Sequence, residues 1–487
     1  MPLGQTARQA LCARHSGAAG MNVYDFVVIG SGPAGRRAAI QAAKLGKKVL
    51  VIEKGTRVGG VSVHTGTIPS KTLRETALNL TGWRERGFYG RSYRVKQEIS
   101  ADDLRRRLLI TLDHEVDVLE HQFARNRVAQ LRGHARFIDK NTIEVIKDDG
   151  EIVRIHADSV LLAVGTRPFR PAHIPFDGDK IIDSDEILEI KEVPRSMVVI
   201  GAGVIGIEYA TIFSALDTAV TVIEPRDTML DFLDKEIVED FAYQLRDRNM
   251  KLVFGQTVEK VEKEPSGKCR VTLQNGRSMI AEMVLFAAGR VGATDSLDLA
   301  ACGLEADNRG RIKVDPETFQ TAVPGIYAAG DVVGFPSLAS TSMEQGRIAA
   351  RHAVGAPAHE PPQYFPYGIY AVPEISTCGL TEEEVQQRCI PYECGVAHFR
   401  ETSRGHIMGL DSGLLKMIFS LKTRRLLGVH IVGEGATELV HIGQAVLNLK
   451  GTVEYFVENT FNYPTLAEAY KIAGLDAWNR MGELKGA

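Results

Sequence analysis

Two stretches of the chain share one pattern of apolar and glycine positions. Each begins with a short apolar run, continues through a glycine-rich turn and an Ala-rich segment, and ends in a second apolar run closed by glutamate; they span residues 24–54 and 196–225. In both, the glutamate follows the third glycine by 18 residues (53 − 35 and 224 − 206). Because strand, glycine turn, helix and strand in this order build a βαβ unit, the repeat predicts two dinucleotide-binding domains.

The remaining patterns predict the elements around these units. Residues 101–126 place leucine, valine and phenylalanine at helical spacing, with charges on the other face. Residues 134–165 alternate and predict β-hairpins ending in VLLAVGTRP, and residues 251–290 predict short strands, with a hairpin turn at Asn275-Gly276, before VLFAAGR. Pro-rich residues 357–366 predict a linker. The chain beyond it, to about residue 475, mixes strands and helices without a dinucleotide fingerprint.

The first glycine turn has the residues that a dinucleotide needs. Gly30 permits a tight turn, Gly32 lets the backbone approach a pyrophosphate, and Gly35 allows close packing of helix on strand. The pyrophosphate would then lie at the helix N-terminus, where free N–H groups and the helix dipole favour an anion. Glu53, at the end of the second strand, is placed to accept hydrogen bonds from ribose hydroxyls.

The second glycine turn repeats this arrangement with Gly201, Gly203, Gly206 and Glu224. Glu224 favours NAD, because a carboxylate repels a ribose 2′-phosphate. Arg226 lies two residues further on and is either a partner for that phosphate or an ordinary solvated arginine. The sequence therefore permits both NAD and NADP.

Composition narrows the class of protein. The 487 residues include 44% hydrophobic side chains, carry a formal net charge of −3 and contain six cysteines. We expect a cytoplasmic protein without a disulfide scaffold, with no nucleic-acid surface, no membrane span and no metal site. Residues 1–20 contain basic but no acidic side chains. They are expected to be a disordered extension or to precede a start at Met21, and an organellar transit segment is the alternative.

The order of several further motifs along the chain resembles that of a known protein family. Asp331 in GIYAAGDV, followed by Glu344-Gln345-Gly346, is either a ligand of a ribityl or phosphate group or a helix N-cap. Together with VLLAVGTRP and VLFAAGR, these motifs resemble the pyridine nucleotide–disulfide oxidoreductase family over nearly the whole chain after Met21. The resemblance implies an α/β fold with two Rossmann-like domains and a C-terminal α+β dimerisation domain. It implies FAD binding by residues 21–170 and 291–357, NAD(P) binding by residues 171–290, and self-association into a homodimer or larger homo-oligomer through residues 358–487.

The chain departs from this family at the redox centre. GGVSVHTGTIPSK, residues 59–71, matches the family's G-G-x-C-x4-C-x-P-S-K segment, but Ser62 and Thr67 occupy the two cysteine positions. FNYPTLAE matches the family's H-P-T-x-x-E pattern, with Tyr463 in place of histidine and Glu468 kept. A tyrosine with a pKa of about 10 is a poor thiol base. The thiols and their base have been lost together, which argues for a changed reaction.

Other parts of the redox machinery are retained. Lys71 and Glu208 match an ion pair that the family places beside the flavin and nicotinamide, where the lysine can stabilise negative charge on the reduced ring. Cys389 and Cys394 also have Cys-x4-Cys spacing, but without the flanking glycines or P-S-K. We expect them to be unpaired structural thiols.

These parts predict hydride exchange between coenzymes. Without a disulfide, the electrons that FAD takes from NAD(P)H can pass from FAD to a second, oxidised coenzyme. The resulting ping-pong reaction is NADPH + NAD⁺ ⇌ NADP⁺ + NADH. Within the family, GTIPSKTLRE and FNYPTLAEAY are most similar to the Si-specific transhydrogenases, whose first cysteine is commonly kept where this chain has Ser62. A diaphorase or quinone reductase and a non-catalytic FAD-binding scaffold remain alternatives.

The predicted site residues fall into two groups. The expected catalytic residues are Lys71, Glu208, Tyr463 and Glu468. The expected cofactor-binding residues are Lys71 again and Gly30, Gly32, Gly35, Glu53, Lys54, Gly165, Asp331, Gly201, Gly203, Gly206, Glu224, Arg226, Gly289 and Arg290.

Overall fold

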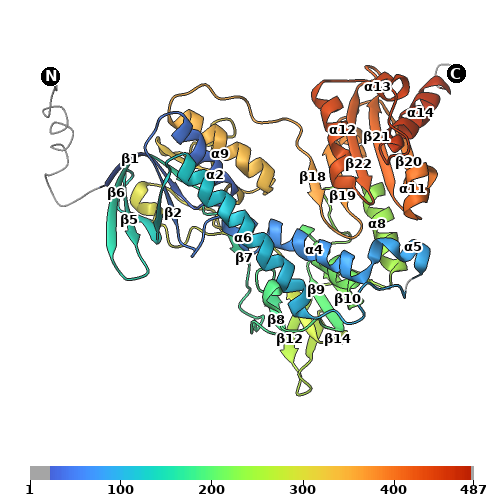
Figure 1. Cartoon of the computed structure of the whole chain (residues 1–487), viewed down its shortest axis with the longest axis horizontal. Coiled ribbons are helices and arrows are strands. Elements are labelled where there is room, and N and C mark those ends of the chain that lie inside the picture. Colours follow the sequence, from blue (N-terminus) through green and yellow to red (C-terminus); the bar gives the residue numbers. More distant parts are fainter. Residues whose placement is uncertain (1–21, 91, 484–487) are drawn as a thin grey trace, which may run out of the picture. The chain divides into compact units, whose positions relative to one another are not determined.

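The computed structural model describes residues 22–90 and 92–483, so the predictions for residues 1–20 lie outside it (Figure 1). The chain has a mixed α/β fold, as predicted, and divides into two compact units. The first unit combines the chain up to Ser62 with Glu115–Arg167 and Val291–Pro361. The second combines Val63–His114, Pro168–Arg290 and the chain from Pro362 onward.

A seven-stranded sheet forms the centre of the first unit. Strand β1 (Asn22–Ile29) pairs in parallel with β2 (Val49–Glu53) and β6 (Ile152–Leu162), and helix α2 (Pro33–Lys44) connects β1 to β2, so the predicted βαβ unit is present. The middle of β1 is fully buried, as expected for a parallel strand covered on both faces. The other strands are β3 (Ala129–Arg132), β4 (His134–Phe137), β5 (Thr142–Ile146) and β17 (Ile326–Ala328).

Two helices of the first unit pack tightly together. Helix α9 (Ala339–Ala353) lies beside α2 (Figure 1). A Cβ on Gly346 of α9 would lie 2.1 Å from the carbonyl oxygen of Ala34 in α2. The predicted hairpins β4–β5–β6 are antiparallel and confirmed. Short strands β7 (Thr166–Pro168) and β16 (Arg290–Gly292) pair with each other in a separate two-stranded sheet.

The second unit contains the repeated βαβ unit. This repeat lies in a five-stranded sheet whose strands are all parallel. It consists of β9 (Ser196–Ile200), α7 (Val204–Ala215) and β10 (Ala219–Glu224). The rest of this sheet is β8 (Ile181–Asp183), β11 (Lys251–Phe254) and β15 (Met283–Phe286). A separate antiparallel sheet contains β12 (Val258–Lys263), β13 (Cys269–Leu273) and β14 (Ser278–Ala281), with the predicted Asn275-Gly276 turn between β13 and β14.

The C-terminal part of the second unit is an antiparallel sheet with helices packed on it. The strand order is β18 (Tyr367–Ile369), β19 (Ile375–Gly379), β22 (Leu426–Val432), β21 (Leu414–Ser420) and β20 (Tyr392–His398). Helix α12 (Ala436–Asn448) packs on β19 and β22, and α14 (Glu468–Glu483) on β20 and β21. The remaining helices are α10 (Glu382–Gln387), α11 (Ser403–Met408) and α13 (Val453–Glu458). The predicted linker contains no helix or strand between α9 and β18.

Helix α4 (Thr67–Thr81) was not predicted, although the helix over residues 101–126 was and appears as α6 (Ala101–Arg125). The reason lies in the residues that α4 buries. They include Ser70, Thr72, Arg74 and Thr76 as well as its leucines, so no apolar stripe marks the helix in the sequence. Short helices α3 (Gly60–His64) and α5 (Arg86–Tyr89) lie before and after it.

A buried ion cluster joins α8 (Lys235–Asp247) to the C-terminal sheet. Lys416 on β21 is 1% exposed, and its Nζ lies 3.0 Å from Asp234 and 2.9 Å from Glu236, and it also pairs with Glu382. Asp234 is fully buried and caps α8 by accepting from the Glu236 N–H. Burial alone would raise the pKa of Asp234, but His430 and Lys416 lower it. The cluster therefore ties the start of α8 to the C-terminal sheet within the second unit.

Residues 22–90 and 92–483 contain neither a helix that could span a membrane nor a cluster of side chains that could hold a metal ion. None of the helices in these residues is long and apolar enough to cross a bilayer. The same residues hold no group of three or more histidine, cysteine, aspartate or glutamate side chains arranged around a metal.

We predict that Lys416→Met lowers the free energy of unfolding by about 3 kcal/mol, because removing one partner leaves buried carboxylates uncompensated. Lys260→Met is the control: Lys260 pairs with Glu262, and both side chains are largely exposed. It should change the free energy by less than about 0.5 kcal/mol. Urea unfolding followed by circular dichroism measures both, and equal effects would contradict the account.

Candidate functional site

The first glycine turn brings strand, turn and helix into close backbone contact. Gly30 has φ +101°, and a Cβ there would lie 2.4 Å from the Ala163 carbonyl oxygen. A Cβ on Gly35 would lie 1.9 Å from the Gly30 carbonyl oxygen. A Cβ on Gly32 would meet nothing within 4 Å. Two glycines are thus required by the protein's own packing, while Gly32 leaves open space beside the turn.

The second glycine turn repeats this division of roles. A Cβ on Gly206 would lie 2.0 Å from the Gly201 carbonyl oxygen, and a Cβ on Gly201 would lie 2.8 Å from the Ala287 carbonyl oxygen. A Cβ on Gly203 would meet nothing within 4 Å. The middle glycine of each turn therefore leaves room for a group from outside the protein.

Both helices that follow these turns begin without a side-chain cap. Gly32 and Gly203 are the N-caps of α2 and α7, both in extended backbone conformation. The first N–H groups of a helix need partners, and here no side chain of the cap residue supplies one. Open space, uncapped N–H groups and the helix dipole together fit a pyrophosphate at each turn.

Each turn is also tied to its glutamate. Glu53 Oε2 accepts hydrogen bonds from the Ser31 N–H (2.9 Å) and hydroxyl (2.5 Å), and Oε1 accepts from the Gly55 N–H (2.8 Å). Ser31 lies inside the glycine turn, so the carboxylate is fixed beside the place of the pyrophosphate. A fixed acceptor at this position suits the ribose hydroxyls of a dinucleotide.

Glu224 is held in the same way and has an additional partner. Its Oε2 accepts from the Ala202 N–H (2.7 Å), and its Oε1 accepts from Arg226 through the backbone N–H (3.2 Å) and Nε (2.8 Å). Burial alone would raise the pKa of Glu224, but hydrogen bonds from Arg226 and Ala202 lower it. Arg226 also pairs with Asp231, whose carboxylate lies 2.7 Å from Nη1. No sequence motif pointed to Asp231, because the course of the loop brings it to Arg226.

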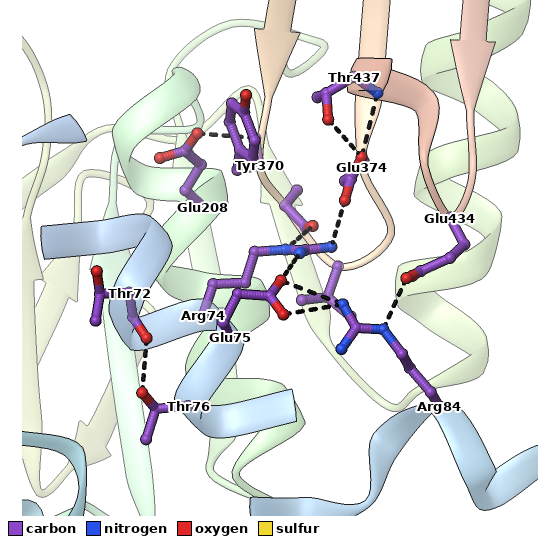
Figure 2. Close-up of polar contacts among 12 residues, drawn as sticks. Thr72, Arg74, Glu75, Thr76, Arg84, Glu208, Tyr370, Glu374, Glu434 and Thr437 are labelled. Carbon is purple, nitrogen blue, oxygen red and sulfur yellow. Dashed lines mark hydrogen bonds and ion pairs between the residues drawn. The ribbon is translucent and has the colours of Figure 1, made fainter. Parts of the chain in front are cut away.

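Lys71 and Glu208 are brought together within the second unit. Lys71 on α4 places Nζ 2.9 and 2.8 Å from the two carboxylate oxygens of Glu208 on α7. Glu208 also accepts from the Tyr370 N–H (2.9 Å; Figure 2), and Lys71 Nζ lies 4.8 Å from the centroid of the Tyr370 ring. The Glu208 side chain is 5% exposed and that of Lys71 is 25% exposed. The Glu208 carboxylate thus holds the Lys71 ammonium in place, and the ammonium retains some access to solvent.

A buried arginine next to this pair was missed by sequence reasoning. Arg74 is 2% exposed, donates from Nε to the Ala371 carbonyl (3.0 Å) and from Nη1 to Glu75 (2.7 Å), and places Nη2 3.1 Å from Glu374 (Figure 2). Glu374 in turn accepts from the N–H and hydroxyl of Thr437. These contacts fix α4, which carries Lys71, against the segment that carries Tyr370.

A second arginine extends the network to the C-terminal sheet. Arg84 contacts Glu75 (3.2 Å) and donates from Nε to Glu434 (2.7 Å; Figure 2). Glu75 therefore lies between two arginines. The helical segment carrying Lys71 is held at its middle and beyond its end by charged groups from the C-terminal part of the same unit.

The two positions at which the family has cysteines lie in helices α3 and α4. Ser62 lies on α3 and donates to the Gly59 carbonyl (3.2 Å), and Thr67 is the first residue of α4. The hydroxyl of Tyr463 forms a hydrogen bond with Ser403 (2.6 Å), and the Tyr463 side chain is 67% exposed. Glu468 begins α14, and its Oε2 is buried without a hydrogen-bond partner. No hydrogen bond joins Tyr463 to Glu468 in the part of the chain that the structure describes.

The other predicted residues are spread over both units. In the first unit Asp331 opens a 3₁₀ turn, and Gln345 accepts from the Gly330 N–H (2.8 Å). Lys54 is exposed, and a Cβ on Gly165 would meet nothing within 4 Å. In the second unit a Cβ on Gly289 would also meet nothing, and Arg290 pairs with Asp185 (3.1 Å).

The two cysteines with Cys-x4-Cys spacing are both free. Cys389 is exposed, and Cys394 lies on β20. Burial raises the pKa of the Cys394 thiol to about 12, so its reactive thiolate form is scarce at neutral pH. The other described cysteines are buried free thiols: Cys269, Cys302 and Cys378.

Two family models match the chain. The model described as "Pyridine nucleotide-disulphide oxidoreductase" matches residues 24–346. The model described as the "dimerisation domain" of the same family matches residues 365–473. Together they cover the glycine turns, the Lys71–Glu208 pair and the C-terminal sheet.

Full-length relatives and a solved structure agree with these models. The chain is 53% identical to a "Soluble pyridine nucleotide transhydrogenase" from Mycobacterium bovis, over 95% of this chain and 99% of that protein. It is 42% identical to a protein of the same name from Colwellia psychrerythraea, over 94% of this chain and 98% of that protein. The crystal structure of LpdA from Mycobacterium tuberculosis superimposes with a TM-score of 0.85 and 25% identity, covering 93% of this chain and 99% of LpdA.

We predict that Gly32→Ala and Gly35→Ala fail in different ways. Gly32→Ala should fold with stability within about 1 kcal/mol of the parent but lose most of the dinucleotide, because the new methyl fills the space beside the pyrophosphate. Gly35→Ala should lose folded protein, because its methyl meets the Gly30 carbonyl. Flavin absorbance and thermal melting of purified protein measure the two effects. Retention of flavin by Gly32→Ala would refute the assignment of the turn.

Proposed function

Because the chain belongs to the pyridine nucleotide–disulphide oxidoreductase family, we propose that it uses FAD to catalyse NADPH + NAD⁺ ⇌ NADP⁺ + NADH. One observation carries this proposal: both dinucleotide turns and the Lys71–Glu208 pair are intact, while Ser62 and Thr67 stand at the family's cysteine positions. The names of the full-length relatives support the same reaction.

The proposed division of labour follows the two glycine turns. Residues 21–170 and 291–357 are proposed to hold FAD, with Gly30, Gly32 and Gly35 around the pyrophosphate and Glu53 on the ribose. Bound FAD supplies a ring that takes up a hydride from one nicotinamide and returns it to another. Lys54, Gly165 and Asp331 are proposed to complete this site.

Residues 171–290 are proposed to bind the two coenzymes in turn. Gly201, Gly203 and Gly206 would surround the pyrophosphate, Glu224 would accept from the ribose of NAD(H), and Arg226 would meet the 2′-phosphate of NADP(H). Gly289 and Arg290 are proposed to line the same site. One site suffices for both coenzymes, because a ping-pong exchange needs them one after the other.

Lys71 is proposed to stabilise the negative charge that the cofactor gains with the hydride. Glu208 holds the ammonium through both carboxylate oxygens, and the Tyr370 N–H fixes Glu208 in turn. A preorganised cation of this kind stabilises charge without moving during the reaction. Arg74 and Glu374 would act through α4 as positioning residues.

The C-terminal residues 358–487 are proposed as the surface of a homo-oligomer. The family model for this part is a dimerisation domain. Tyr463 and Glu468 are proposed to contribute to the site, although Tyr463 cannot replace a histidine as thiol base at neutral pH. A cytoplasmic location is also proposed, consistent with the free thiols of the five described cysteines.

We predict that FAD-loaded protein transfers hydride from NADPH to a spectrally distinct analogue of NAD⁺. Double-reciprocal plots should show parallel lines, because one product leaves before the second coenzyme binds. Lipoamide and oxidised glutathione should not be reduced, since Ser62 and Thr67 cannot form a disulfide.

Three results would count against this function. Absence of hydride transfer would eliminate it. Catalytic efficiency with quinones that exceeds that with NAD⁺ by orders of magnitude would favour a quinone reductase. Flavin absorbance that NADPH leaves unchanged would favour a non-catalytic FAD-binding protein.

We predict that Lys71→Met lowers kcat roughly 100-fold and leaves the KM of each coenzyme within about threefold, because the lost charge acts on the reaction step. Lys260→Met removes an exposed lysine from the same unit and should leave kcat unchanged. Equal loss in both variants, or a loss confined to KM in Lys71→Met, would refute the proposed role.

A further inference from the structure

Arg226 makes more contacts than a phosphate-binding arginine requires. Its Nε donates to Glu224 (2.8 Å) and its Nη1 pairs with Asp231 (2.7 Å). The hydrogen bonds to Glu224 and Asp231 raise the pKa of Arg226. The backbone is fixed on both sides, because the Arg226 carbonyl accepts from the Gly255 N–H and its N–H donates to Glu224. Any change of partner must therefore come from the side chain, which is 46% exposed.

Asp231 stands on a rigid loop. The preceding residue, Leu230, is 1% exposed, and its N–H donates to the carbonyl of Ala202 in the second glycine turn (3.3 Å). The Leu233 N–H donates back to the Leu230 carbonyl (3.0 Å), and Asp234 is held in the buried cluster of Lys416. These contacts fix the backbone on both sides of Asp231 relative to the glycine turn, so a change in the partners of Arg226 would have to come from the side chains.

The two coenzymes differ only at the ribose 2′-position that this corner would face. A 2′-hydroxyl can donate to Glu224, and Arg226 can then keep both carboxylates as partners. A 2′-phosphate brings negative charge towards Glu224 and needs a cation. For Arg226 to meet the phosphate, its side chain must exchange at least one carboxylate for it.

We propose that Asp231 is a specificity-determining residue, which holds Arg226 beside Glu224 and so sets the affinity for NADP(H) relative to NAD(H). This inference rests on the proposed function, because it assigns the choice between coenzymes to that same site. Asp231 competes with the 2′-phosphate for the arginine. The competition lowers the affinity for the phosphorylated coenzyme relative to that for NAD(H).

The test uses fragments that carry the 2′-position but no nicotinamide, so that binding is measured without hydride transfer. Isothermal titration of FAD-loaded Asp231→Asn with adenosine 2′,5′-bisphosphate should give a Kd about three- to fivefold lower than that of the parent. The Kd for 5′-AMP should stay unchanged. An unchanged ratio of the two Kd values would overturn the proposal.

Asp217→Asn is the matched control. The Asp217 side chain is 49% exposed, as is that of Asp231, and it also pairs with arginines, Arg86 and Arg94. Asp217 has φ +68°, which asparagine tolerates. Its substitution removes the same charge elsewhere and should leave both Kd values unchanged. If Asp217→Asn raised the affinity for adenosine 2′,5′-bisphosphate as much as Asp231→Asn does, the change in net charge would explain the effect, and the proposal would be overturned.

A double-mutant cycle separates competition for Arg226 from direct repulsion of the phosphate. Arg226→Gln should weaken adenosine 2′,5′-bisphosphate binding about tenfold and leave 5′-AMP unchanged. In that background Asp231→Asn should bring no further gain. A gain of the same size would show that Asp231 repels the phosphate directly and would overturn the proposal. Failure of hydride transfer with these Kd shifts present would refute the proposed function alone.

Discussion

The close backbone approach at two glycine turns is the constraint on which the rest of the structure depends. At each turn the third glycine lies so near the first glycine's carbonyl that a Cβ would be about 2 Å from it, while the middle glycine faces open space. A glutamate at the end of the next strand then accepts an N–H from inside the turn. At each of the two turns, uncapped helix N–H groups therefore lie close to a fixed carboxylate. Each of these places suits a dinucleotide.

The proposed reaction differs from that of the family's disulfide-bearing enzymes at the step in which electrons leave the flavin. Ser62 and Thr67 cannot accept them, and Cys389 and Cys394 are free thiols of the C-terminal part. Lys71 is nevertheless held by both carboxylate oxygens of Glu208, and Glu208 in turn accepts a hydrogen bond from the Tyr370 N–H. Retention of a preorganised cation beside a lost disulfide is expected of an enzyme that still moves hydride but passes it to another coenzyme.

Periodic patterns and glycine spacing predicted the fold class, both βαβ units, the hairpins and the long helix α6. They did not predict α4, since that helix buries arginine, serine and threonine as well as leucine. Glu53 and Glu224 were predicted because their chemistry is local in sequence, and the Lys71–Glu208 pair was predicted only through the resemblance to the family. Arg74 with Glu374, and Arg226 with Asp231, are pairs whose partners the folded chain or a loop brings together. No periodicity marks such pairs.

The central claim is that a hydride entering this protein has no sulfur pair to receive it. Anaerobic titration of FAD-loaded protein with NADPH, followed by addition of NAD⁺, tests it most directly. The account predicts that one equivalent of NADPH bleaches the flavin completely, that no second equivalent is consumed, and that NAD⁺ restores the absorbance. Consumption of a second equivalent, as a redox disulfide would require, or a flavin that NAD⁺ fails to reoxidise, would contradict it.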